Sequence, residues 1–166
     1  MPKLMATYIV ALVLLLTSCK KGDAGPAGAT GATGNANVSE TTFQVNSWTS
    51  GSSYWLADFN VSALTATNLT SSAVEVFFST NNGTNWYAVP YTAVGSTNYF
   101  MGFATGANLV EVQWTYNGAG NGSDPNTYFG VTAVLYKIVV IPPAMKIPNV
   151  NTHDYNTLKA VYNLKD

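Results

Sequence analysis

Alternation between apolar and polar residues dominates the chain from residue 41 to residue 141. The segment 109–116 shows it best, because every second residue is apolar: Val110, Val112, Trp114 and Tyr116. A period of two places such residues on one face of a β-strand, whereas an amphipathic helix needs a period near 3.6. Similar runs predict strands at 42–48, 54–61, 73–80, 85–91, 98–104 and 129–141. Seven or eight short strands between turns predict an all-β fold, an antiparallel β-sandwich of immunoglobulin-like or jelly-roll type.

The run 129–141 is the longest and most apolar, and it contains a single charged residue, Lys137. We expect a central strand with a β-bulge at this lysine, or a bend between the two sheets. The dipeptide Pro142-Pro143 ends the run, because proline cannot donate to a strand ladder.

The segment 154–164 follows and predicts a short C-terminal helix, with Asp154 or Thr152 as its N-cap. Its apolar face carries Tyr155, Leu158 and Tyr162. We expect this helix to pack on the sandwich, with packing on a neighbouring copy as the alternative.

Charged residues make up only 9% of the 166-residue chain, and arginine is absent. A nucleic-acid-binding surface needs a basic stripe, so the composition argues against nucleic acid as a partner. Aromatic residues reach 13%, which excludes an intrinsically disordered chain. The polar share is mostly Ser, Thr and Asn, which suits an extracellular β-domain.

The N-terminal segment 4–16 is almost wholly apolar and follows Lys3. It is too short to span a bilayer and has the length of a signal-peptide core. The sequence Leu16-Thr17-Ser18-Cys19 that follows resembles the bacterial lipobox. The resemblance implies that residues 1–18 are removed and that Cys19, the single cysteine, carries the lipid anchor. An ordinary secretory signal that leaves Cys19 as a free thiol is the alternative.

Glycine recurs at every third position after the cysteine: Gly22, Gly25, Gly28, Gly31 and Gly34. This is the collagen pattern, in which only glycine fits the axis of three wound chains. With five triplets and one proline, a flexible spacer between lipid and domain is the preferred interpretation, and a homotrimeric stalk is the alternative. The segment 19–28 resembles the start of collagen-like lipoproteins of Bacteroidota. That resemblance implies an exported protein anchored at the bacterial outer membrane or cell surface, and it implies no chemistry.

The chain therefore divides into four predicted regions. They are a signal peptide at 1–18, the lipidated cysteine and spacer at 19–37, a β-sandwich at 38–143 and a helical tail at 144–166.

The segment 79–86, Ser-Thr-Asn-Asn-Gly-Thr-Asn-Trp, resembles the Asp-box, with asparagine in place of its aspartate. That motif forms a non-catalytic hairpin turn in propeller proteins, where it is repeated. Because it occurs once here, we expect only a hairpin between two strands.

Residues suited to catalysis are few, and each has a simpler explanation. His153, the single histidine, stands at the start of the tail helix, where a surface position is expected. The carboxylates of the body are Asp58, Glu75, Glu111 and Asp124. Glu75 and Glu111 alternate with apolar neighbours, so we expect solvated positions. The oxygen-rich loop 118–126 holds one carboxylate, which is too few for a typical calcium site. We expect no catalytic residue, metal or cofactor, and therefore no enzyme. An enzyme is the third alternative, and it would require a cleft that brings at least two of these four carboxylates within about 10 Å of each other.

Adjacent aromatic pairs are the remaining candidates for binding. Neighbouring residues of a strand point to opposite faces, so one member each of Tyr54-Trp55 and Trp86-Tyr87 must leave the main core. We expect a structural, adhesive or interaction role for a surface lipoprotein with a glycan or protein ligand. The alternative is a carbohydrate-binding lipoprotein in which these aromatic residues stack on sugar rings.

Overall fold

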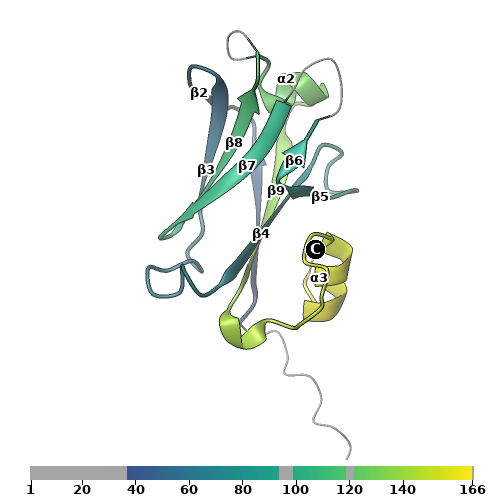
Figure 1. Cartoon of the computed structure of the whole chain (residues 1–166). Helices are drawn as coiled ribbons and strands as arrows, with labels where there is room; N and C mark the ends of the chain where they lie inside the picture. Colours follow the sequence, from purple (N-terminus) through teal and green to yellow (C-terminus); the bar gives the residue numbers. More distant parts are fainter. Residues whose placement is uncertain (1–36, 94–98, 119–121, 166) are drawn as a thin grey trace, which may run out of the picture. The chain divides into compact units, whose positions relative to one another are not determined.

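The structure, a computed structural model, describes residues 37–93, 99–118 and 122–165. Within them the chain forms two antiparallel sheets, which confirms the predicted all-β sandwich with a short C-terminal helix (Figure 1). The four-stranded sheet has the order β1 (Ser39–Val45), β9 (Val134–Ile141), β4 (Ala73–Ser79) and β5 (Tyr87–Val89). The five-stranded sheet has the order β2 (Thr49–Ser50), β3 (Tyr54–Asn60), β8 (Leu109–Tyr116), β7 (Tyr99–Gly106) and β6 (Tyr91–Thr92).

The main core lies between the two sheets and is built by the alternation described above. Val110, Val112 and Trp114 of β8 are fully buried there. Trp114 stacks on Tyr99 with ring centroids 4.9 Å apart, and its indole nitrogen donates a hydrogen bond to the carbonyl of Ser123. Core packing therefore accounts for much of the aromatic content.

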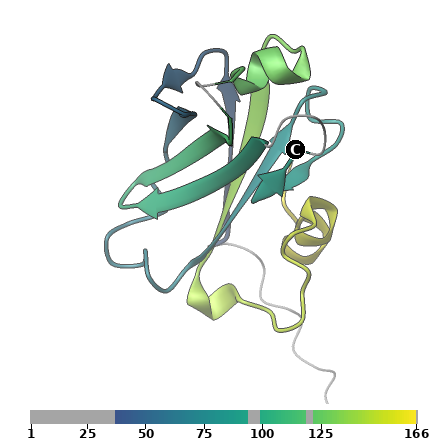
Figure 2. The ribbon, with the colours of Figure 1, turned by 45° about the horizontal axis from the view of Figure 1, so that its top comes forward.

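The four-stranded sheet is also buried over part of its outer face, along β4 and β9. There Phe77 of β4 and Val139 and Ile141 of β9 contact the helix α3 (Tyr155–Tyr162). Figures 1 and 2 show α3, in yellow, beside β4 and β5. The predicted packing of the tail on the sandwich is confirmed. Among the helices of the described residues, none is both long and apolar enough to cross a bilayer.

The predicted strand 129–141 is wrong in its first residues, because β9 begins only at Val134. The preceding residues form the short helix α2 (Pro125–Phe129). Asp124 accepts a hydrogen bond from the backbone N–H of Thr127 and caps this helix, and proline fits its first turn. Gly130 ends it in the left-handed conformation at φ 67°.

The bulge or bend expected at Lys137 is absent from the register of β9. Lys137 pairs with Thr42 of β1 on one side and with Phe77 of β4 on the other, without interruption. The expectation was wrong because the charge finds partners on the outer face of the sheet, so the backbone has no need to turn it toward solvent.

The predicted strand 85–91 is divided between the two sheets. Tyr87–Val89 forms β5 of the four-stranded sheet, and Tyr91–Thr92 forms β6 of the five-stranded sheet. Pro90 separates them, since it has no backbone N–H with which to continue a ladder.

The buried side chain of Asn126 in α2 joins three segments of the chain. Its amide nitrogen lies 3.1 Å from the carbonyls of Val45 and Asn46 and 3.2 Å from that of Thr132. Its amide oxygen accepts a hydrogen bond of 3.1 Å from the Trp48 indole. One side chain thus ties the end of β1 to the segment that leads into β9.

We expect Asn126→Ala to lower the free energy of unfolding by about 2–3 kcal/mol, because it leaves buried carbonyls and an indole N–H without partners. Urea denaturation monitored by circular dichroism measures the loss. The exposed Asn60 on β3 supplies the matched control, and Asn60→Ala should change stability by about 0.5 kcal/mol or less. Equal losses in both variants would contradict the bridging role.

Candidate functional site

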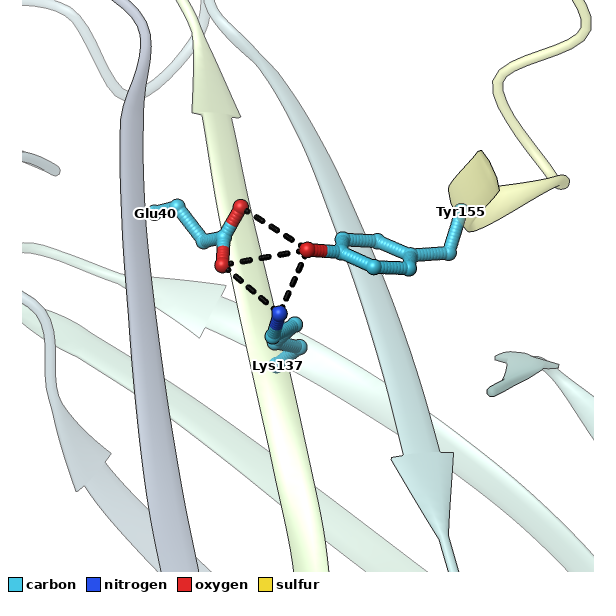
Figure 3. A network of polar contacts seen from close by, with 3 residues as sticks. All are labelled: Glu40, Lys137 and Tyr155. Carbon is cyan, nitrogen blue, oxygen red and sulfur yellow. Dashed lines mark hydrogen bonds and ion pairs between the residues drawn. The ribbon is translucent and has the colours of Figure 1, made fainter. Parts of the chain in front are cut away.

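A buried charge on the outer face of the four-stranded sheet is the most unusual feature of the described residues. Lys137, in the middle of β9, is only 4% exposed. Its ammonium group lies 2.9 Å from Oε1 of Glu40 on β1 and donates a hydrogen bond to the hydroxyl of Tyr155 on α3 (Figure 3). We call these three residues the clasp, because they connect two strands and the helix.

Each polar group of the clasp has more than one partner. The Tyr155 hydroxyl lies 3.3 Å from each carboxylate oxygen of Glu40. The ammonium group of Lys137 also lies 4.2 Å from the Tyr155 ring centroid and 5.0 Å from that of Trp86. These cation–π contacts and the ion pair offset the cost of taking a charge out of water.

The protonation state of the clasp follows from these contacts. Burial alone would lower the pKa of Lys137, but hydrogen bonds to Tyr155 and Glu40 and the charge of Glu40 together raise it above 10.5. Burial raises the pKa of the Tyr155 hydroxyl above 10.0. At neutral pH the lysine is therefore charged and the tyrosine protonated. A charged ammonium is a poor nucleophile and a poor base, so this arrangement suits attachment of α3 better than covalent chemistry.

A second contact fastens the segment that leads into α3. His153 Nδ1 lies 3.6 Å from Oε2 of Glu75 on β4. Burial raises the pKa of Glu75, while a hydrogen bond with Thr152 and the proximity of His153 oppose that rise. The prediction that His153 is a surface residue is confirmed. The prediction that Glu75 is solvated was wrong, because the tail covers the outer face to which it points.

The predicted binding aromatics do not gather at one place. Trp55 packs against the main core, and Trp86 lies beneath α3 with its ring centroid 5.7 Å from that of Tyr155. Tyr87, at 45% exposure, packs beside Phe78 and Tyr91 at the end of the four-stranded sheet. Tyr54 lies on the outer face of the five-stranded sheet.

Of the other candidate residues named from the sequence, Asp124 has a structural role and Cys19 lies outside the described residues. Asp124 caps α2, and residues 119–121 of the oxygen-rich loop 118–126, where no calcium was expected, lie outside the described residues. Among the described side chains, no three of His, Cys, Asp and Glu are grouped closely enough to hold a metal ion. Cys19 and the glycine period also lie outside the described residues.

The segment that resembles an Asp-box forms the predicted hairpin turn between β4 and β5. The Ser79 hydroxyl accepts from the backbone N–H of Gly83, and Asn81 Oδ1 accepts from that of Asn85. Gly83 adopts φ 82°, a conformation that favours glycine.

Glu40 and Tyr155 were missed as partners of Lys137 by the sequence patterns. The available signal was the lone lysine inside a long apolar run. A buried charge requires a partner, but alternation alone does not indicate which carboxylate supplies it.

We expect Glu40→Gln to lower the free energy of unfolding by about 2–4 kcal/mol, because it leaves the buried ammonium of Lys137 without an opposing charge. Glu111→Gln is the matched control on the other sheet, and it should not lower stability, because Glu111 lies opposite the like charge of Asp58. Urea denaturation of both variants measures the difference.

The double variant Glu40→Gln with Lys137→Met should regain much of the loss, since it removes both charges together. A double variant that is less stable than Glu40→Gln alone would contradict this account of the clasp.

The clasp also predicts a loss of stability at alkaline pH. Lys137 and Tyr155 hold their protons more tightly in the folded chain, since their folded pKa values lie above 10.5 and 10.0. Their contribution is therefore complete below about pH 10 and is lost as pH rises through the folded pKa values. Thermal unfolding from about pH 8 to about pH 11 should show a steeper fall for the native chain than for Lys137→Met combined with Tyr155→Phe. Parallel curves would contradict the assignment.

The chain was compared with known proteins at three levels. No protein-family model matches it, and no curated protein or solved structure matches it either.

Proposed function

We propose that the protein is a lipid-anchored bacterial surface protein that presents its β-sandwich for a structural, adhesive or interaction role. The observation that carries the proposal is the sequence Leu16-Thr17-Ser18-Cys19 directly after the apolar segment 4–16. An acylated Cys19 anchors the chain at the outer membrane or cell surface.

The segment between anchor and sandwich acts as a spacer in this proposal. The glycine period of residues 22–34 would hold the domain away from the lipid surface. A homotrimeric stalk remains the alternative, and the spacer is preferred because five triplets with a single proline give little support to a triple helix.

A non-enzymatic role is supported by the way in which the fold uses Lys137 and four of its six described carboxylates, Glu40, Glu75, Asp124 and Asp154. The buried lysine is held in its charged state by Glu40 and Tyr155. Asp124 and Asp154 cap α2 and α3. These groups stabilise the sandwich and its helix.

Carbohydrate binding is the second candidate function. The observation that favours it is the exposed Phe100, which lies on the same outer face of the five-stranded sheet as Tyr54. An exposed aromatic ring on a sheet face can stack on a sugar ring.

We expect Cys19→Ser to abolish lipidation, because only the thiol can form the thioether that joins the chain to the lipid. In a bacterial host supplied with a labelled fatty acid, the native chain should incorporate the label and sediment with membranes. Ser18→Ala, which keeps a small residue before the cysteine, is the matched control and should behave like the native chain. A native chain that carries no label would refute the anchor, as would label retained in Cys19→Ser.

A further inference from the structure

Two carboxylates of the described residues have no role in the fold. Glu40 pairs with Lys137, Glu75 lies 3.6 Å from His153, and Asp124 and Asp154 cap helices. Asp58 and Glu111 have neither a hydrogen bond nor an ion pair within the part of the chain that the structure describes. They are direct cross-strand partners on β3 and β8. Like charges in this position are destabilising, so the pair adds nothing to the stability of the sheet.

Both carboxylates lie on the outer face of the five-stranded sheet. Their strand neighbours Phe59, Val110 and Val112 are buried in the main core, so alternation turns Asp58 and Glu111 away from it. Directly opposite residues of an antiparallel pair have Cβ atoms about 4.5–5.5 Å apart. A single bound cation can therefore reach both carboxylates.

Two aromatic residues share this face and lie against glycines. Phe100 of β7 is 46% exposed, and a Cβ atom added at Gly102 would come within 2.9 Å of its ring. A Cβ atom added at Gly51 would come within 2.3 Å of the Tyr54 ring. Gly102 lies in β7 and Gly51 in the turn between β2 and β3, and at both places the missing side chain leaves room for a ring to lie against the backbone.

The register orders these side chains in rows across β7, β8 and β3, which run side by side in Figure 1. The aromatic row contains Phe100, Thr115 and Tyr54; the next contains Gly102, Gln113 and Leu56; and the third contains Ala104, Glu111 and Asp58. An open hollow of about 290 Å³ includes Phe100, Gly102, Gln113 and Glu111 in its lining. Rings, an amide and a charge pair thus follow one another along the strands.

We propose that this face binds a glycan that carries free amino groups, an inference that rests on the carbohydrate-binding function suggested above. A sugar ring stacks on Phe100, and its hydroxyl groups bond to the amide of Gln113. An ammonium group of the glycan lies between Asp58 and Glu111 and relieves their mutual repulsion. Tyr54 supplies a second stacking position for a longer chain.

The placement of these groups favours a glycan over a basic peptide. Extended peptides gain much of their affinity from main-chain hydrogen bonds at a sheet edge. Here β8 and β7 are paired on both sides, and the face offers only side chains. The ammonium groups of a lysine-rich peptide could pair with the carboxylates, but such a peptide has no ring to stack on Phe100 and Tyr54.

The test uses the full chain, solubilised in a detergent without sugar groups, and a soluble glucosamine oligomer in isothermal titration calorimetry. We expect Phe100→Ala to weaken binding about tenfold, and the double variant Asp58→Asn with Glu111→Gln to weaken it by at least that factor. Tyr87→Ala changes an equally exposed aromatic residue of the other sheet and should leave binding unchanged. Circular dichroism of each variant verifies that the fold is kept.

Three further measurements separate the alternatives. The fully N-acetylated oligomer should bind clearly more weakly, and equal affinity would overturn the role of the amino group. An oligolysine that binds as tightly as the glycan, with the same losses in the variants, would replace the glycan by a basic peptide. No binding of the glucosamine oligomer to a chain that is still lipidated at Cys19 would overturn this inference and leave the anchor proposal standing.

Discussion

The attachment of α3 to the outer face of the four-stranded sheet depends on the ion pair between Lys137 and Glu40. A strand that is buried on both faces cannot keep an ammonium group in its middle unless an opposing charge is close. Glu40 supplies that charge, and Tyr155 closes the space above it. The helix α3 therefore does more than cover Phe77 and Val139. It completes the surroundings in which the central strand can carry a lysine.

The two sheets use their charges in opposite ways. On the four-stranded sheet, Glu40, Glu75 and Lys137 bind partners beneath the tail. On the five-stranded sheet, Asp58 and Glu111 have no such partners in the described residues, and they face outward together. The first arrangement explains how the tail is attached. The second leaves two carboxylates together on an outer face, where the proposed ligand would meet them.

Much of the fold could be predicted from the sequence because alternation is a local signal. Val110, Val112 and Trp114 indicated a strand and its buried face correctly, and Asp154 indicated the start of the helix. The elements that were predicted wrongly depend on one or a few residues, which a periodic pattern does not reveal. Asp124, Pro125 and Gly130 form a helix of only five residues, too short for periodicity to reveal. Pro90 divides one apparent strand between two sheets.

The candidate sites were harder to predict, because they depend on the register between distant segments. Lys137 meets Glu40 only because β1 and β9 pair, and Asp58 meets Glu111 only because β3 and β8 pair. Tyr54 was among the predicted aromatic residues, whereas Phe100 was not, since nothing in its strand distinguished it from a core residue. An exposed aromatic residue differs from a core residue only in its exposure, and exposure depends on tertiary packing.

The position of Glu40 has a mechanical consequence for a tethered protein. Strand β1 begins at Ser39, whose partner Val140 lies near the end of β9. A pull transmitted from an N-terminal anchor would load the hydrogen bonds of this antiparallel pair one after another, in the manner of a zipper. The bond between Glu40 and Lys137 lies close to the end at which such unzipping would begin. The same ion pair that permits a lysine in the central strand would then resist detachment of that strand under tension.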